Sequence, residues 1–387
     1  MSKSGRGLGR PRSFLFARAK AVLAASGPTG LGYNQRLTMT QAGLHQNVAL
    51  NGERTGKYLG VDTALSFAGP AQELTALRSG CGVFDLNWRA LIHVNGKDRV
   101  RWLHNMVSNN IRDLQPNRGN YNFVLNAQGR ILADLYVFNR GESLLIQTDR
   151  NQVEALLATI KRFIIMDKVE LSDAGDTLGA IGIAGPQAAQ TLAAAGLDVS
   201  GMQPLEIHDA AAGEIRVRVI SGPEQKPHWF EIWLDPAHAQ AFAKQLTDAG
   251  AQPAGAEALE IWRVLRGIPQ YGKDIRDRDL PQETGQVQAL NSNKGCYIGQ
   301  EIVERIRSRG AVHRKFTGFE FEDAVPAVGK FDMEGRTVAE LTSTAHVPGT
   351  NRAVGLGYVR VDAIPSDGAI DLNGCKTKIV ELPFAGF

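Results

Sequence analysis

The spacing of apolar residues between positions 72 and 163 predicts a mixed α/β domain. Helical segments carry apolar residues every three or four positions, as at Val100, Leu103 and Val107, whereas strands alternate. The predicted order is helix, strand, helix, hairpin, strand and helix, over residues 72–80, 84–94, 98–109, 121–138, 143–148 and 151–163. Gly129 supplies the positive φ that the hairpin turn requires. This element order is typical of a mixed domain rather than a doubly wound one.

A second series of elements begins at residue 177. Its predicted strands and helices lie at residues 177–184, 187–194, 215–221, 229–234, 237–249 and 255–266. The pair Gly185-Pro186 ends the first strand. The two series are roughly alike, so we predict two related subdomains within residues 39–310, divided near residue 170.

From residue 316 onward the helical period disappears. Short strands alternate with Gly, Pro and Asp turns, at residues 316–321, 337–344, 353–361 and 376–381. This alternation of short strands and turns predicts a small β-barrel or sandwich over residues 311–387. The whole chain is therefore expected to be an α+β protein.

Composition narrows the class of protein. The chain has 387 residues, 43% of them hydrophobic and 21% charged, as in a water-soluble protein of two or three domains. No apolar run is long enough to span a bilayer. The cysteines Cys81, Cys296 and Cys375 are far apart, which suits a reducing compartment better than a disulfide framework. The histidines show no metal-ligand spacing, and we expect no metal site.

The first 38 residues differ from the rest. They hold seven basic side chains and no acidic one, which leaves residues 39–387 with a net charge of −4. Such a body has no global field that would attract DNA. The segment has the traits of an organelle transit peptide, but we favour a disordered or non-native extension, since Met39 offers a plausible start. We exclude it from the fold and expect a cytoplasmic protein, or a matrix protein if the segment is a transit peptide.

The sharpest motif is residues 294–301, KGCYIGQE. A helix is predicted to start near Gly299, which places Cys296 just before a helix N-terminus and beside the cation of Lys294. Both effects favour the thiolate. The flanking glycines permit a tight loop. The alternative is a structural cysteine in a loop.

This motif resembles the K-G-C-aromatic-x-G-Q-E signature of the YgfZ-type folate-binding family, homologues of the glycine-cleavage T protein. The stretch 185–188, GPQA, is similar to a motif of the same superfamily. The resemblance implies two mixed α/β subdomains around a central folate cavity, followed by a C-terminal β-barrel. It also implies that Cys296 is an essential thiol, supported by Lys294. The remaining signature residues are Gly295, Tyr297, Gly299, Gln300 and Glu301.

The stretch 126–137, NAQGRILADLYV, resembles the T-protein segment N-x-x-G-G-I-x-D-D-L-x-V. In that family the first aspartate of the pair acts on the folate amine. Here Ala133 replaces it, while Asp134 matches the second aspartate. A methyl group cannot relay a proton, so this departure argues against aminomethyl transfer but leaves a folate site open. The alternative for Asp134 is an exposed strand residue.

The strand 229–234 carries a second candidate folate ligand. Alternation places Trp229, Glu231 and Trp233 on one face. One carboxylate can accept two N–H groups from the amide edge of a pterin, and an aromatic ring can stack on it. Glu231 also matches the pterin-binding glutamate of the superfamily. The alternative is an acid that merely faces a cleft.

Three further residues are candidate folate ligands through the resemblance. Arg263 matches an arginine near the end of a T-protein helix and is suited to hold a folate carboxylate. Tyr271 follows at the family's spacing, and Trp88 lies near the position of a folate-contacting tryptophan. A helix-surface arginine and a core tryptophan are the alternatives.

These observations favour a tetrahydrofolate-binding accessory protein rather than a turnover enzyme. Its expected partners are folate and iron–sulfur client enzymes or assembly factors, including those of tRNA modification. Thiolates ligate iron and exchange with oxidised sulfur, so Cys296 suits that work. No direct DNA binding or membrane association is expected, and we expect a monomer. The alternative is an aminomethyltransferase, the T protein of the glycine cleavage system.

Overall fold

The computed structural model describes residues 50–385, except positions 176, 225–227, 311 and 323. The predicted N-terminal extension over residues 1–38 lies outside the described residues. Among the described helices, none is both long and apolar enough to cross a membrane.

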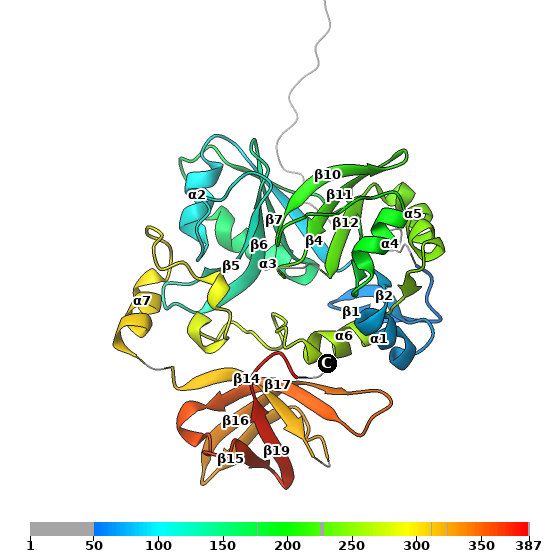
Figure 1. Cartoon of the computed structure of the whole chain (residues 1–387). Coiled ribbons are helices and arrows are strands. Elements are labelled where there is room, and N and C mark those ends of the chain that lie inside the picture. The colour runs from blue at the N-terminus through cyan, green and yellow to red at the C-terminus, as the bar shows by residue number, and fades with distance from the viewer. Residues whose placement is uncertain (1–49, 176, 225–227, 311, 323, 386–387) are drawn as a thin grey trace, which may run out of the picture. The chain divides into compact units, whose positions relative to one another are not determined.

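The first sheet is antiparallel and five-stranded, with the order β5-β6-β7-β4-β8. Its elements are β4 (Arg89–Asn95), β5 (Gly119–Leu125), β6 (Ile131–Asn139), β7 (Leu144–Asp149), β8 (Glu170–Asp173), and the helices α2 (Arg99–Met106) and α3 (Arg150–Lys161). Both helices bury their apolar faces against one side of this sheet. The predicted hairpin β5–β6 is confirmed, and Gly129 turns it with φ 71°. The other side of the sheet is thereby left to face the rest of the chain (Figure 1).

The second sheet has six strands in the order β10-β11-β12-β9-β3-β13. Its elements are β3 (Gly82–Asp85), β9 (Gly179–Ala184), β10 (Ile207–Ala212), β11 (Ile215–Ser221), β12 (Trp229–Leu234), β13 (Gln252–Pro253), and the helices α4 (Ala188–Ala194) and α5 (Pro236–Asp248). Helices α4 and α5 pack on one face, in the same manner as α2 and α3 on the first sheet.

The predicted single strand over residues 84–94 is wrong. The segment forms two strands, β3 and β4, which belong to different sheets. The chain crosses between the sheets at residues 86–88, where Leu86 N donates to Ala180 O of the second sheet and Arg89 begins β4. The apolar pattern runs through the crossing because both strands are buried, so it gave no sign of the break. Trp88 and Arg89 consequently lie between the sheets.

A central core joins the two sheets to the remaining elements. It includes Phe84 and Trp233 of the second sheet, Phe138 of the first and Trp262 of α6 (Ala256–Leu265). The hairpin β1 (Arg54–Tyr58) and β2 (Val61–Ser66) and the helix α1 (Pro70–Ser79) lie beside α6.

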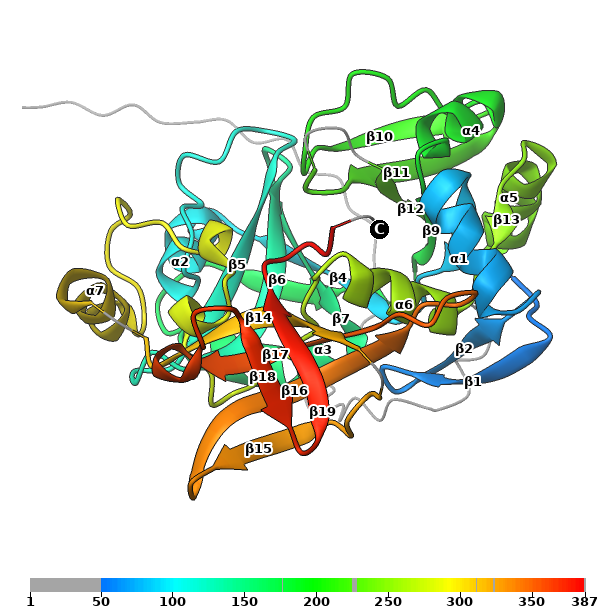
Figure 2. The same cartoon turned by 60° about the horizontal axis from the view of Figure 1, so that its bottom comes forward.

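The C-terminal region forms a curled six-stranded sheet with the order β15-β16-β17-β14-β19-β18 (Figure 2). Its strands are β14 (Arg314–Phe321), β15 (Gly329–Met333), β16 (Arg336–His346), β17 (Ala353–Arg360), β18 (Ala369–Leu372) and β19 (Cys375–Val380). The expected barrel is not closed, because β15 and β18 end the sheet and are not paired with each other in the described residues. The helix α7 (Gln300–Arg309) and the short 3-10 helices η2 (Pro281–Glu283) and η3 (Val287–Ala289) precede this sheet.

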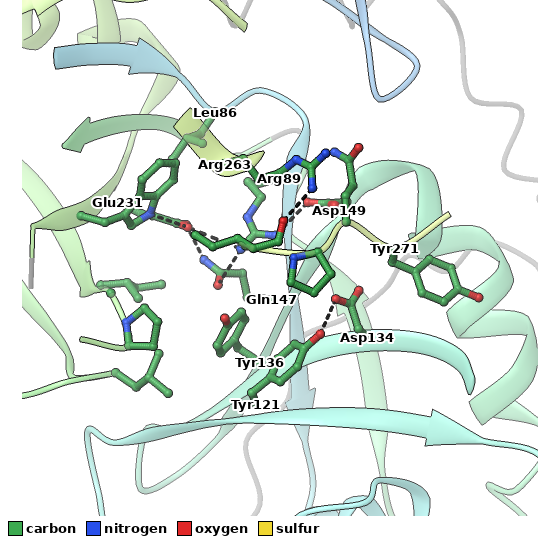
Figure 3. Close-up of a pocket in the computed structure, with 18 of the residues that line it drawn as sticks. Leu86, Arg89, Tyr121, Asp134, Tyr136, Gln147, Asp149, Glu231, Arg263 and Tyr271 are labelled. Carbon is green, nitrogen blue, oxygen red and sulfur yellow. Dashed lines mark hydrogen bonds and ion pairs between the residues drawn. The ribbon is translucent and has the colours of Figure 1, made fainter. Parts of the chain in front are cut away.

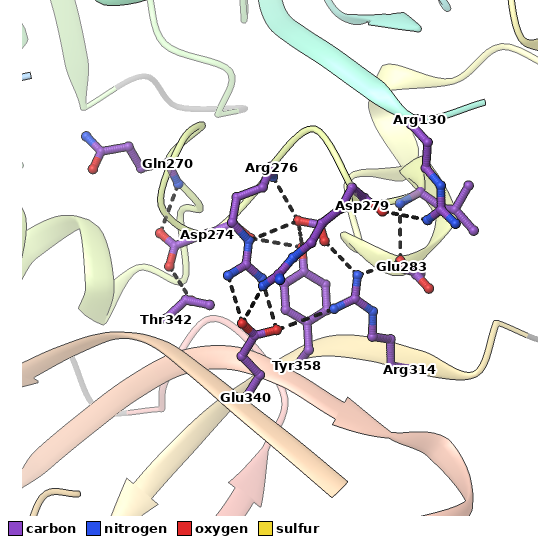
Figure 4. A network of polar contacts seen from close by, with 12 residues as sticks. Arg130, Gln270, Asp274, Arg276, Asp279, Glu283, Arg314, Glu340, Thr342 and Tyr358 are labelled. Carbon is purple, nitrogen blue, oxygen red and sulfur yellow. Dashed lines mark hydrogen bonds and ion pairs between the residues drawn. The ribbon is translucent and has the colours of Figure 1, made fainter. Parts of the chain in front are cut away.

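A network of hydrogen bonds and ion pairs joins the curled sheet to the segment that follows α6 (Figure 4). Asp279 is fully buried and accepts hydrogen bonds from Arg314 Nη2 at 2.6 Å and from the Tyr358 hydroxyl at 3.2 Å. Arg276 and Arg314 both form ion pairs with Glu340 of β16. The network therefore fixes the segment 270–283 between the sheet and the α/β part.

Candidate functional site

A cavity of about 320 Å³ lies between the two α/β sheets. Its walls come from β4, β6 and β7 of the first sheet, β12 of the second, α6, and segments near residues 58, 268 and 286. Two carboxyl groups that the sequence singled out, Asp134 and Glu231, line it from opposite sheets. The cavity that the resemblance implied is therefore present between the two sheets.

Asp134 lies on the cavity side of β6, where the Tyr121 hydroxyl points at its carboxyl group (Figure 3). The Tyr121 hydroxyl donates to its Oδ2 at 2.7 Å, and Gln152 Nε2 donates to its Oδ1 at 2.9 Å. Burial raises the pKa of Asp134, and the nearby negative charge of Asp149 raises it further. These hydrogen bonds lower the pKa but do not outweigh burial. A cavity carboxyl whose pKa is raised in this way is a candidate for proton exchange with a ligand.

Ala133 points the other way. It is only 2% exposed and packs in the apolar core between the first sheet and the helices α2 and α3. Adjacent strand residues face opposite sides of a sheet, so positions 133 and 134 cannot both reach the cavity. The sequence argument against one-carbon transfer was wrong, because the group that position 133 lacks would not have faced the cavity.

Glu231 of β12 is 3% exposed and accepts several hydrogen bonds. Trp229 Nε1 and Trp233 Nε1 donate to it at 3.3 and 3.2 Å, and Gln147 Nε2 makes a short third bond. Both tryptophans share its face, as the alternation predicted. A bound ligand with N–H donors would replace the longer of these bonds.

Arg89 joins the two sheets across the cavity, and sequence reasoning missed it. Its Nη1 lies 2.7 Å from Asp149, and its Nη2 lies 3.5 Å from Glu231 (Figure 3). Burial lowers the pKa of Arg89, but the carboxylates of Glu231 and Asp149 outweigh burial and raise it. Asp149 therefore carries its own counter-ion, whereas Asp134 has none within ion-pair distance among the described residues. An arginine at the start of an apolar strand was the signal that could have revealed this contact.

Trp88 and Tyr271, two predicted folate ligands, also line the cavity. The ring of Trp88 meets Tyr58 edge to face, with centroids 4.9 Å apart. The Tyr271 hydroxyl donates to Leu132 O at 2.7 Å. Tyr136 lines the same cavity, as does the Trp229–Trp262 pair, whose centroids lie 5.5 Å apart. The cavity thus offers flat aromatic surfaces to a planar ligand.

Arg263 reaches the cavity lining but is engaged by the protein. Its guanidinium donates to Glu260, Asp274, Ser343 and the carbonyl oxygen of Ile268. These bonds take up all five of its N–H donors. We therefore do not retain Arg263 as a folate-carboxylate ligand; its contacts are those of a structural residue between α6 and the curled sheet.

The cysteine motif lies outside the cavity lining. Cys296 is exposed, but Lys294 does not provide the cation that was expected beside it. Lys294 is buried, and its Nζ donates to the carbonyl oxygens of His104, Val107 and Asn109. Burial lowers the pKa of Lys294 to about 7, with a smaller contribution from Arg112. The predicted activation of the thiol by Lys294 therefore has no support in this geometry.

The other motif residues build the loop and the start of α7. Gly299 has φ 83°, and a Cβ there would lie 2.5 Å from Asn126 O. Gly295 has open space around it. Tyr297 is buried under the Lys294 ammonium, Gln300 Oε1 accepts from Tyr297 N at 3.3 Å, and Glu301 is exposed in the first turn of α7. Much of this motif is therefore explained by local structure.

Comparison with known proteins identifies the family. The model of the GCVT N-terminal domain family matches residues 39–294, more than half of the chain, so this protein belongs to that family. YgfZ-type proteins are GcvT-like members too, so the resemblance was correct at this level. Proteins of the family use tetrahydrofolate, which confirms the predicted cofactor.

Individual relatives refine the comparison. The chain is 28% identical over 360 residues to the aminomethyltransferase of Rubrobacter xylanophilus, with 90% of this chain and 95% of that protein covered. It is 25% identical over 347 residues to the aminomethyltransferase of Bacillus subtilis, with 86% and 95% covered. The crystal structure of glycine cleavage system aminomethyltransferase T from Bartonella henselae matches with a TM-score of 0.77 and 22% identity, over 86% of this chain and 94% of that one. The T-protein-like fold is thereby confirmed.

The predicted role as an iron–sulfur accessory protein is wrong. Several curated relatives that match most of this chain are aminomethyltransferases, which favours the alternative that the sequence placed second. The geometry removes the argument from Ala133 and the support expected from Lys294 for the Cys296 thiol. Position 133 faces the core, and Lys294 is bonded to backbone carbonyls rather than supporting the thiol. The predicted partners that depended on this role, iron–sulfur client enzymes and factors of tRNA modification, are therefore not supported.

Proposed function

We propose that this protein is an aminomethyltransferase that passes the carbon of an aminomethyl group to tetrahydrofolate. The observation that carries the proposal is the part-buried carboxyl of Asp134 on the cavity wall, with its pKa raised by burial and by Asp149. The curated relatives support the same activity.

The cavity fits the pterin of tetrahydrofolate. Glu231 offers carboxylate oxygens to the N–H groups on the pterin edge, and Trp229, Tyr136 and Trp88 offer aromatic faces or edges. A planar ligand anchored at Glu231 would extend across the cavity towards the first sheet. Asp134 and Tyr271 line that side and are proposed to contact the remainder of the folate.

The reaction moves two protons from the folate amines to the two leaving groups. Tetrahydrofolate supplies two amine nitrogens, which together bind the transferred carbon. Two C–N bonds form, the carbon's bonds to nitrogen and sulfur in an aminomethyl-thioether donor break, and the two amine protons leave with ammonia and the thiol. Asp134 accepts a proton from the folate amine as the first bond forms and returns it to a leaving group. Tyr121 and Gln152 orient its two oxygens.

The test is an assay of methylenetetrahydrofolate formation from tetrahydrofolate and an aminomethyl-lipoyl donor. The wild type should turn over about once per second or faster. Asp134→Asn should lower kcat by roughly 10²- to 10⁴-fold, because it keeps the shape but cannot accept a proton. Asp248→Asn, on an exposed face of α5, is the matched control and should be unchanged. A wild type without product above background would overturn the proposal.

A further inference from the structure

Two segments far apart in sequence are joined by hydrogen bonds beside the cavity. The first is the end of α2 with the turn after it, residues 104–109, and the second is residues 288–294. The ammonium of Lys294 donates to His104 O at 2.6 Å, to Val107 O and to Asn109 O at 2.9 Å. These carbonyls lie at the C-terminal end of a helix, where a cation is favoured and where carbonyls lack helical partners.

Three further bonds join the same segments. The Ser108 hydroxyl donates to Ala289 O at 2.5 Å, Asn109 Nδ2 donates to Gln288 O at 2.8 Å, and Asn291 N donates to Ser108 O at 3.3 Å. Ser108 is fully buried, as is Ala289. We call this set of contacts between residues 104–109 and 288–294 the α2 latch.

The latch holds part of the cavity wall. Gln288 lies on η3 and Gln286 directly precedes it, and both line the same cavity as Asp134 and Glu231. Gln288 Nε2 donates to Gln286 Oε1 at 2.8 Å, which sets the two amides side by side. Besides the latch, this segment has its own short turns, contacts with β5 and η2, and the packing of Ala289 and Leu290 in an apolar cluster with Ile275.

Resting on the proposed function, we propose that Lys294 is a positioning residue of the tetrahydrofolate site. It holds the segment 286–290 in the arrangement that completes the cavity. Its chemistry suits this task, since an ammonium has three N–H groups for three carbonyls and a neutral amine still has two. Within the described part of the chain no carboxylate pairs with it, so its contacts are those with the carbonyls and the Tyr297 ring, 4.6 Å from Nζ.

The expected consequence is a loss of affinity rather than of chemistry. Asp134 lies on β6 and is held by Tyr121 and Gln152, none of which touches Lys294. When the binding-competent arrangement is only partly populated, the apparent affinity falls by that fraction. If loosening the latch leaves about one molecule in ten competent, KM for tetrahydrofolate rises about 10-fold.

The test compares Lys294→Met with two controls, Cys296→Ala in the same loop and Lys315→Met, which removes an exposed lysine of β14. Lys294→Met should raise KM for tetrahydrofolate about 10-fold and change kcat less than about threefold. Calorimetric titration with folinic acid should show the same loss of affinity. Both controls should match the wild type. Hydrogen exchange should speed up in residues 286–294, and not across the whole chain, in Lys294→Met.

A second arm does not depend on that variant folding. In the wild type, folinic acid should slow hydrogen exchange of residues 286–294, because a ligand that needs the closed latch stabilises it. Asn109→Ala should raise KM in the same direction, and its effect should not add to that of Lys294→Met, because both act on one contact set. Unchanged affinity in a folded Lys294→Met protein, or no protection by folinic acid in a wild type that binds it, overturns the inference. A wild type that does not bind folinic acid overturns the proposed function instead.

Discussion

Substituting Ala133 by aspartate tests which face of β6 serves the cavity. The side chain at position 133 is 2% exposed and lies in an apolar core that includes Ile92, Leu103 and Val137. Ala133→Asp would bury a carboxyl group there. An unpaired buried polar group costs roughly 2 kcal/mol or more, and overpacking costs about 1–3 kcal/mol. The free energy of unfolding should therefore fall by about 3–5 kcal/mol.

Urea denaturation followed by tryptophan fluorescence measures this change. Ala133→Val is the control, because it adds volume without a polar group and should cost only the overpacking part, about 1–3 kcal/mol. The difference between the two variants isolates the buried carboxyl. Ala133→Asp should not increase one-carbon transfer, because its carboxyl lies behind the sheet.

The opposite result would refute this reasoning. If Ala133→Asp is as stable as the wild type and transfers the carbon faster, the side chain at position 133 faces the cavity. Asp134 would then lose its proposed role in proton transfer.

Three further predictions concern the carboxyl groups. Tyr121→Phe removes a hydrogen bond that favours the ionised form of Asp134, so the pKa of Asp134 should rise. The acidic limb of the pH profile of kcat/KM should then move about 1–2 pH units higher. The control variant Tyr136→Phe should leave this limb in place. Glu231→Gln replaces a carboxylate, which only accepts hydrogen bonds, by an amide whose NH2 group donates. Calorimetry should therefore show an affinity for folinic acid about 10- to 150-fold lower. Equal affinity would mean that Glu231 does not bind the pterin. Asp279→Asn removes a fully buried carboxylate from two part-buried arginines that keep their ion pairs with Glu340, so urea denaturation should show a loss of about 1.5–3 kcal/mol, and no measurable loss would contradict its place in the network.

Local pattern determined most of the elements. The predicted helices over residues 151–163, 237–249 and 255–266 match α3, α5 and α6 to within a few residues, because each carries an apolar stripe at helical spacing. Alternation likewise placed Glu231 between two tryptophans on one strand face. These features depend only on neighbours along the chain, which the sequence displays directly.

The resemblance to a known family located part of the site as well. Asp134, Glu231, Trp88 and Tyr271 all line the cavity, as the resemblance implied, although their contacts with folate remain proposals. The same resemblance misled where it treated Ala133 as a missing catalytic group. A sequence match fixes a position along the chain but not the side of the sheet to which that position points.

Contacts between groups far apart along the chain depend on how the sheets and helices pack. Arg89 pairs with Glu231 of the other sheet, and Lys294 with the end of α2, across separations of more than a hundred residues. No local period encodes such contacts, because they depend on how sheets and helices pack. The same holds for the C-terminal sheet, which does not close into a barrel. Pairing of its end strands β15 and β18 would depend on the curvature of the whole sheet, which no single segment of sequence shows. Local patterns along the chain therefore predict the elements and their apolar faces, whereas packing decides which side chains share the cavity.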